Sequence, residues 1–266
     1  MRILLIVAVA MLLTACESVE TTQPGAVGIE RQQHMMVSSK EIEQAAAQEY
    51  RKVIAQAQQK GILDRNSQHV QRVRATLNRI IPQTRVFRPD APGWAWEVHV
   101  LQDNQMNAWA MPGGKMVVYS GLIEKLNLTD DELAAIMGHE IAHSLREHAR
   151  EQVSREMATS VGVGIAGALL GLGEIGQQLT SVVADVALNK PHSRTNEVEA
   201  DRIGVELAAR AGYNPHAAVS LWQKMAQAAG SSGPQFLSTH PSPENRLADL
   251  KVYADRVMPL YQTARR

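Results

Sequence analysis

The stretch that most constrains this chain is HEIAH, in which His139 and His143 lie four residues apart with Glu140 beside the first. In a helix, residues four apart lie on the same face, so both imidazoles can bind one metal ion. Structural zinc sites are closed by four protein ligands, whereas hydrolytic sites use a free carboxylate to take a proton from water. The pattern therefore predicts a hydrolytic metal site on a helix.

Because short patterns of this kind also occur by chance in unrelated helices, the surrounding sequence matters. Thr129 and Glu132 form a capping-box pattern, which sets the start of a helix independently of the histidines. We expect this helix to run from about residue 129 to 157. Apolar residues at helical spacing give it a buried stripe, so the inward polar groups of HEIAH need a partner such as a metal ion. These apolar residues are Leu133, Ile136, Met137, Ile141 and Leu145.

The composition allows one full hydrophobic core and gives no sign of a nucleic-acid partner. The 266 residues are 45% hydrophobic, and 27 basic residues balance 27 acidic ones. A neutral chain without a basic run has no phosphate-binding surface, so we expect no nucleic acid. Aromatic residues make up only 4% of the chain, which predicts a core of aliphatic and alanine-rich helices.

The N-terminus predicts export and a lipid anchor. Arg2 precedes a short apolar run, which is typical of a secretory signal over residues 1–15 and too short for a membrane-spanning helix. Cys16 is the only cysteine and follows Leu-Thr-Ala, as in the lipobox of bacterial lipoproteins; the alternative is an ordinary cleavage site with a coincidental cysteine. Residues 16–37 are polar and aperiodic, so we expect a disordered tether to a domain spanning 38–266.

The rest of the chain predicts a mostly helical α+β domain. Helices are expected over about 38–60, 66–81, 177–188, 193–210, 214–230 and from 242 onward, and strands over 94–101, 107–111 and 115–119. We expect a small antiparallel sheet beside the HEIAH helix; its edge could bind an extended peptide, or the strands could be simple hairpin core. The apolar, glycine-rich residues 158–173 read as a packed or mobile helical hairpin.

Two carboxylates on the 193–210 helix complete the pattern. Glu197 and Asp201 are four residues apart, so one can bind the metal while the other accepts a hydrogen bond from a ligand histidine. The metzincin class would require glycine and histidine where this chain has Arg146 and Ala149, so that class is excluded. A later glutamate followed four residues on by aspartate is the gluzincin arrangement, and this pair fits it.

Taken together, these motifs resemble the zinc metallopeptidase family of the HtpX heat-shock protease, the CaaX prenyl endopeptidase and the Oma-type protease. The lipobox points to its periplasmic lipoprotein branch, which resembles the β-barrel assembly-enhancing protease without its repeat domain. The resemblance covers about residues 95 to 250. The matching segments are Asn107-Ala108, Pro112-Gly113-Gly114, HEIAH, Ser193-Arg194, Glu197, Ala200-Asp201, His240-Pro241 and Arg246.

The resemblance implies a zincin-like fold and one Zn²⁺ per chain, bound by His139, His143 and Glu197. It implies that Glu140 is the general base and that Asp201 orients a ligand. His240 would be either a donor to the oxyanion or a fourth ligand that keeps the enzyme latent. Arg246 and Asn107 would support the transition state or the cleft. The remaining histidines are expected at the surface or in packing, with His148 on the far side of its helix: His34, His69, His99, His148, His192 and His216.

The implied function is an endopeptidase that degrades misfolded or misassembled envelope proteins. Glu17, after the cysteine, favours the periplasmic face of the outer membrane, where the outer-membrane assembly machinery would be a possible partner. The alternative is a non-proteolytic, zinc-containing chaperone or assembly factor. Glu140 discriminates between the two, because a binding protein has no use for a free carboxylate beside the metal.

Overall fold

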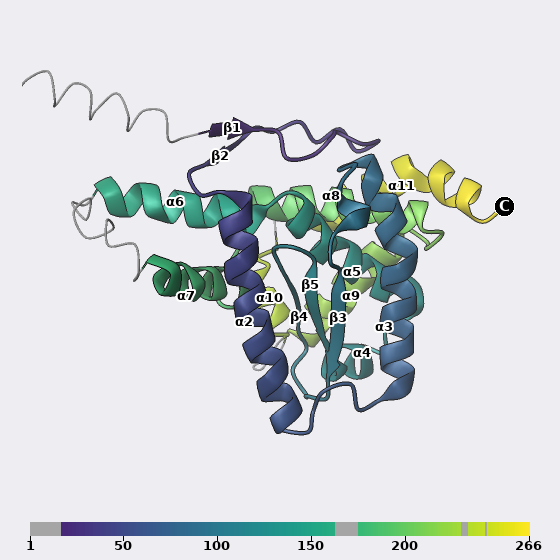
Figure 1. Cartoon of the computed structure of the whole chain (residues 1–266). Coiled ribbons are helices and arrows are strands. Elements are labelled where there is room, and N and C mark those ends of the chain that lie inside the picture. The colour runs from purple at the N-terminus through teal and green to yellow at the C-terminus, as the bar shows by residue number, and fades with distance from the viewer. Residues whose placement is uncertain (1–16, 163–174, 230–233, 243) are drawn as a thin grey trace, which may run out of the picture.

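The computed structural model describes residues 17–162, 175–229, 234–242 and 244–266, and it confirms a mostly helical α+β fold (Figure 1). Among these residues, no helix is both long enough and apolar enough to cross a membrane. The predicted signal, Cys16 and most of the glycine-rich 158–173 stretch lie outside the described residues. The longer helices are α2 (Ser39–Gln59), α3 (Ser67–Ile80), α5 (Asp130–Leu145), α6 (His148–Gly162), α7 (Ile175–Leu188), α8 (Arg194–Arg210), α9 (Ala217–Ala228) and α11 (Arg246–Ala264).

The main sheet has three strands and is mixed, so the expectation of an antiparallel sheet is only half right. Its strands are β3 (Glu97–Leu101), β4 (Ala108–Met111) and β5 (Lys115–Tyr119), in the order β3-β5-β4. β4 and β5 form an antiparallel hairpin, whose turn holds Gly113 and Gly114 at positive φ. β3 pairs with the other side of β5 in parallel. The chain therefore passes across the sheet between β3 and β4, and β4 is left at an edge.

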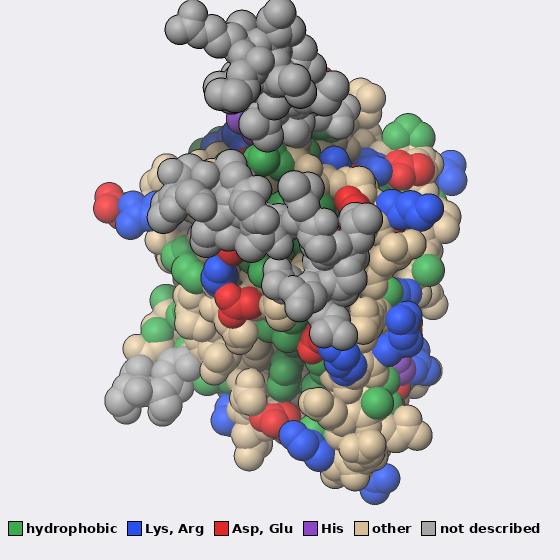
Figure 2. Space-filling model, turned by 60° about the vertical axis from the view of Figure 1, so that its left-hand side comes forward, with side chains coloured by type: hydrophobic (Ala, Val, Ile, Leu, Met, Phe, Trp, Pro, Cys, Tyr) green, Lys and Arg blue, Asp and Glu red, His purple; other side chains and the backbone are tan. Residues whose placement is uncertain are grey.

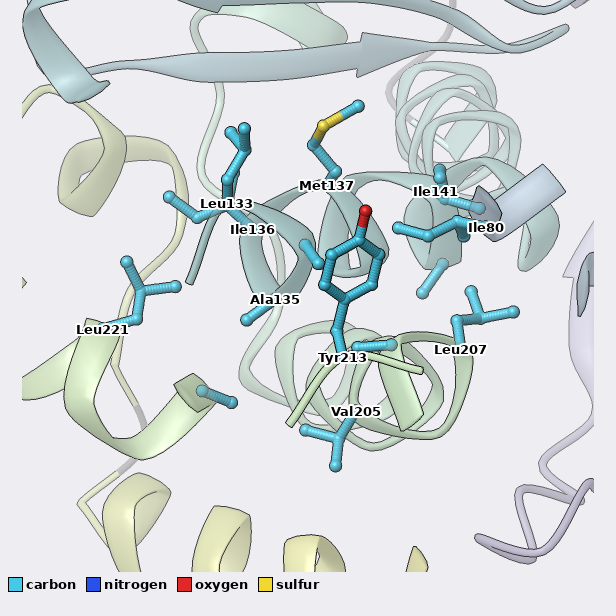
Figure 3. Close-up of a cluster of buried hydrophobic side chains, with 14 of the residues drawn as sticks. Ile80, Leu133, Ala135, Ile136, Met137, Ile141, Val205, Leu207, Tyr213 and Leu221 are labelled. Carbon is cyan, nitrogen blue, oxygen red and sulfur yellow. The ribbon is translucent and has the colours of Figure 1, made fainter. Parts of the chain in front are cut away.

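The sheet lies between helices on both faces because its side chains alternate (Figure 1). Val117 faces one hydrophobic cluster, together with Tyr50 of α2, whose hydroxyl donates to the carbonyl of Met116. Met116 and Val118 face the other cluster, which α5 dominates. In Figure 3, Leu133 and Met137 project from α5 toward the strands, whereas Leu207 and Tyr213 approach α5 from the opposite side.

Short elements connect this core. They are the 3-10 helices η1 (Ile81–Val86) and η2 (Ala91–Gly93) and the short α-helices α4 (Ser120–Lys125) and α10 (Phe236–Thr239). On the face shown in Figure 2, acidic, basic and hydrophobic side chains are interspersed.

The helix predicted over 129–157 is two helices. The capping box of Thr129 and Glu132 is formed as expected, but α5 ends at Leu145. Glu147 then adopts a φ of 50°, in the left-handed region, and α6 begins at His148. The chain direction changes at this turn, which a continuous helical pattern does not reveal.

Residues 17–37, here called the N-terminal segment, are ordered rather than the disordered tether that we expected. Strands β1 (Glu17–Val19) and β2 (Gln33–Met35) pair antiparallel, and the segment runs along one side of the domain (Figure 1). Val27 and Met35 are each 1% exposed. The backbone N–H of Val27 donates to Glu206 of α8, and that of Met36 donates to Ser154 of α6. Although the segment is polar in composition, burial of Val27 and Met35 and these two hydrogen bonds stabilise it against the domain.

Candidate metal centre

The two helices α5 and α8 bring three candidate ligand side chains together. Nε2 of His139 and Nε2 of His143 lie 3.0 Å apart. The carboxylate of Glu197 lies 3.5 Å from Nε2 of His139 and 3.4 Å from Nε2 of His143. In a tetrahedral zinc site with bonds of about 2.0–2.2 Å, ligand atoms are about 3.3 Å apart. The three side chains therefore have the spacing of a zinc site.

The group also contains a buried acceptor whose charge is not fully compensated. All three side chains are buried, and Oε1 of Glu197 has no hydrogen-bond partner among the described residues. Burying an unpaired carboxylate oxygen is unfavourable unless a positive charge compensates it. Burial lowers the pKa of His143 well below 6.5, and nearby histidines add to the effect, so this imidazole stays neutral. A neutral imidazole is the form that binds metal.

His240 joins the same group from the turn between α10 and α11. Its nitrogen lies within 4.8 Å of the three donors, which makes a buried set of four possible ligands. The ring stacks on Phe236 at 4.1 Å, and its Nδ1 lies 3.1 Å from the carbonyl oxygen of Phe236. Its Nε2 lies 3.3 Å from Oε1 of Glu140. Within the described chain neither of these two atoms has a hydrogen-bond partner, so His240 is held with its Nε2 toward the centre.

Glu140 stands beside the ligands with its proton affinity increased. Burial raises the pKa of its carboxyl well above 4.5, and the negative charge of Glu197 raises it further. A backbone hydrogen bond from Ala110 acts in the opposite direction. Because Ala110 belongs to β4, the same contact shows that the edge strand lies against the carboxyl group. A carboxyl of this kind is suited to proton transfer near neutral pH.

Asp201 and Arg246 lie on the other side of the ligands. Oδ1 of Asp201 is 3.0 Å from Nδ1 of His139, so this carboxylate can hold the imidazole with Nε2 free for the metal. Arg246 donates to Asp201 at 2.7 Å and to Glu197 at 2.8 Å. Its guanidinium lies 3.4 Å from the ring centre of Trp222. Burial alone would raise the pKa of Asp201, but the charge of Arg246 and the contact with His139 hold it below its ordinary value.

Asn107 contacts the strand rather than the ligands. Its buried side chain accepts a hydrogen bond from the backbone N–H of Ala108, and its carbonyl accepts from the N–H of Tyr119. It therefore fixes the start of β4, and any contribution to the cleft is through that strand.

Two histidines that sequence reasoning had set aside lie against His143. His148 is fully buried, not on the far side, because the chain turns at Glu147; its Nδ1 is 2.8 Å from Nδ1 of His143. His192 is half-buried and stacks on His143 with ring centres 4.1 Å apart. Neither belongs to the four-donor group. The other histidines that we set aside are away from this group: His34 is exposed, and His69, His99 and His216 pair with acidic side chains.

Sequence reasoning also missed a pair of glycines that allows the ligand helices to approach. A Cβ atom on Gly138 of α5 would lie 2.7 Å from the carbonyl oxygen of Gly204 in α8. A Cβ atom on Gly204 would lie 2.7 Å from the backbone nitrogen of His139. Glycine inside a helix is unfavourable by about 1 kcal/mol relative to alanine, and that was the signal available in the sequence.

Comparison of the sequence with those of known proteins shows which family the chain is similar to. The sequence model of peptidase family M48 matches residues 67–254. Mitochondrial metalloendopeptidase OMA1 of Schizosaccharomyces pombe is 37% identical over 160 residues, which cover 59% of this chain and 46% of that protein. Metalloendopeptidase OMA1 of Bos taurus is 36% identical over 185 residues, covering 64% and 34%. Beta-barrel assembly-enhancing protease of Yersinia pestis is 31% identical over 174 residues, covering 60% and 35%. The chain thus spans less than half the length of each of these relatives.

Proposed function

Because the chain belongs to peptidase family M48, we propose that it is a zinc-dependent endopeptidase. The observation that carries the proposal is the buried group of His139, His143 and Glu197 with the carboxyl group of Glu140 beside it. A purely structural zinc site has no need of that carboxyl group. The alternative, a non-proteolytic chaperone or assembly factor, leaves Glu140 unexplained.

The residues divide the chemistry between them. His139, His143 and Glu197 would hold a zinc ion, which would supply Lewis-acid polarisation of the scissile carbonyl and lower the pKa of bound water to about 7. Glu140, whose raised pKa suits it to gain and lose a proton, accepts one from the attacking water and returns it to the leaving amine. Asp201 keeps His139 in its ligating orientation, and Arg246 holds Glu197 and Asp201.

His240 has two possible roles in this scheme. As a donor it would stabilise the oxyanion of the tetrahedral intermediate. As a fourth ligand it would displace water and hold the enzyme latent, because hydrolysis needs an open position on the metal. The burial of its Nε2 within the four-donor group supports the latent role for the conformation described here.

The edge strand supports a peptide substrate. In the described part of the chain, β4 pairs only with β5, and Ala110 lies against Glu140. An extended peptide added to this edge would form main-chain hydrogen bonds and would bind with little sequence preference. We infer unfolded or misassembled envelope proteins as substrates. The Leu-Thr-Ala sequence before Cys16 supports a lipid anchor on that cysteine, and Glu17 after it supports the periplasmic face of the outer membrane as the location. The outer-membrane assembly machinery is the partner that this placement suggests.

Casein digestion tests the peptidase proposal. A chain that lacks residues 1–16, and with them the anchor, should degrade casein, lose that activity when a chelator removes zinc, and regain it on zinc addition. If zinc-loaded wild type and its His240→Ala variant both leave casein intact yet suppress its aggregation, the chaperone alternative is favoured. For the anchor, Cys16→Ser should move the chain out of the membrane fraction; a variant that stays in that fraction would argue against lipidation.

A further inference from the structure

A continuous set of buried polar contacts links the ligand His143 to the N-terminal segment. Nδ1 of His148 lies 2.8 Å from Nδ1 of His143, and Nε2 of His148 lies 3.1 Å from the carboxylate of Glu199. These three side chains are at most 5% exposed. His148 therefore contacts His143 on the side away from the candidate ligand group, and Glu199 contacts His148 in turn.

The direction of the hydrogen bonds follows from the chemistry of Glu199. A carboxylate accepts hydrogen bonds, so Nε2 of His148 must carry a proton and donate it to Glu199. Nδ1 of the neutral His148 is then the acceptor, and Nδ1 of His143 must be the donor. This leaves the lone pair of His143 on Nε2, which is the atom that faces His139 and Glu197. The reverse arrangement would point a lone pair of His148 at the carboxylate.

Arg31 of the N-terminal segment holds Glu199 in this position. Its guanidinium donates to Glu199 at 2.5 Å and to Glu151 at 2.6 Å, so it joins α8 to α6 beside His148. Arg146 also donates to Glu199, at 2.9 Å, and donates to the backbone carbonyl of Arg31. The segment is therefore in direct contact with the residues that orient His143.

We propose that His148 and Glu199 are positioning residues for the metal ligand His143. Arg31 holds Glu199, so the N-terminal segment contributes to the orientation of His143. Asp201 contacts His139 directly. Glu199 acts on His143 in the same way, but through His148. Loss of such an outer partner typically costs 10 to 100-fold in metal affinity. The proposal rests on the proposed zinc site and is independent of whether the enzyme cleaves peptides.

Zinc affinity of the full chain, measured by competition with a fluorescent chelator, tests the role of His148. His148→Leu should weaken zinc binding by about 10 to 100-fold, while His148→Asn, whose amide oxygen can take the place of Nδ1, should recover most of the affinity. Unfolding temperatures in EDTA report on the metal-free fold, and the visible spectrum of Co²⁺-loaded protein reports on ligand geometry. If His148→Leu and His148→Asn both bind zinc as tightly as wild type, the proposal is overturned.

A second comparison keeps this test decisive if His148→Leu does not fold. His148→Gln reaches toward Glu199 rather than His143, so it should bind zinc more weakly than His148→Asn, although both are amides. Equal affinities for these two variants would count against the positioning role. If wild-type protein itself binds no zinc, the proposed function fails, and that outcome is distinct from failure of the variants.

Arg31→Ala tests the contribution of the N-terminal segment, with Arg155→Ala as the matched control. Arg155 also pairs with Glu151, at 3.4 Å, but its contacts do not include Glu199, and it is 54% exposed. We expect Arg31→Ala to weaken zinc binding by about 3 to 10-fold, less than removal of a direct partner, and Arg155→Ala to leave it unchanged. Equal zinc affinities for the two variants would show that the N-terminal segment does not contribute to zinc binding.

Discussion

At the scale of single residues, three buried carboxylates share one site and differ through their neighbours. Glu140 lies beside the candidate ligands and contacts no Lys or Arg side chain among the described residues, and burial raises its pKa. Asp201 is equally buried, but Arg246 and His139 hold its pKa down. Glu197 pairs with Arg246 through Oε2, which also lies 3.5 Å from Nε2 of His139, and its Oε1 lies 3.4 Å from Nε2 of His143. The same chemical group is therefore suited to proton transfer, ligand orientation and metal binding in turn.

Asp201→Asn should weaken zinc binding or peptidase activity by about 10 to 100-fold, because the amide no longer fixes the ligating form of His139. Isothermal titration with zinc and casein cleavage measure the two quantities. Asp249→Asn is the matched control, since Asp249 also pairs with an arginine, Arg202, on the same pair of helices but away from the metal. Unchanged zinc affinity and rate in Asp201→Asn would show that its contact with His139 is unimportant.

His240→Ala separates the two roles of this residue by the sign of the effect. If His240 keeps the enzyme latent, its removal should raise basal casein cleavage, because the fourth ligand position becomes permanently open. If it donates to the oxyanion, the rate should fall by about 100 to 1000-fold. The rates must be compared at equal zinc content, and indistinguishable rates would reject both roles.

The pairing of His139 with His143, and of Glu197 with Asp201, could be predicted from sequence because residues four apart on a helix share a face. His148 could not be placed in the same way. Its position depends on the left-handed residue Glu147, and a non-glycine residue in that conformation is uncommon. Arg31 was out of reach for a different reason, since its partners Glu151 and Glu199 lie more than a hundred residues away in the chain.

At the scale of elements, the crossing of α5 and α8 determines how closely the ligands can meet. Gly204→Ala should destabilise the fold by about 1 to 3 kcal/mol, because the added methyl group meets the backbone of His139. The gain in helix propensity is only about 1 kcal/mol and does not compensate. Thermal unfolding measures the stability, and zinc affinity should fall with it as the helices move apart.

Gly93→Ala provides the control for this prediction, since a Cβ atom there would meet nothing within 4 Å. It should leave both stability and zinc affinity near wild-type values. Equal behaviour of Gly204→Ala and Gly93→Ala would show that the helix crossing tolerates a wider separation than we infer.

The capping box of α5 predicts a pH dependence of stability. Burial alone would raise the pKa of Glu132, but hydrogen bonds from Lys224 and Thr129 lower it below 4.5. The ionised form is therefore favoured in the folded state, and the stabilisation is present above pH 4.5 and lost as the pH falls below it. Denaturant unfolding of Glu132→Gln should show a shallower acid decline than wild type, with stability at pH 7 lower by about 0.5–2 kcal/mol. Parallel acid declines would exclude this contribution.

The elements themselves were predictable to different degrees. The capping box of α5 formed as expected because it depends on residues within one turn. The sheet order β3-β5-β4 was not predictable, because the parallel pairing of β3 with β5 joins strands that are not neighbours in sequence. The alternation of a strand is the same whether its partner is parallel or antiparallel.

At the scale of the whole molecule, the metal centre depends on segments from the entire described chain. Arg31 lies near its start, the histidines and Glu197 in its middle, and His240 and Arg246 near its end. The α+β class was predictable from helical and alternating patterns. The order of the N-terminal segment was not, because Val27, Ile29 and Met35 are buried against the domain without giving any regular period.

The measurement that tests the central claim most directly is casein cleavage by Glu140→Gln and wild type at equal, measured zinc content. The substitution leaves His139, His143 and Glu197 untouched, so the variant should bind zinc as wild type does. Its cleavage rate should fall by about 100-fold or more, because the group that takes the proton from water is gone. A fully zinc-loaded Glu140→Gln that cleaves casein at the wild-type rate would contradict the account.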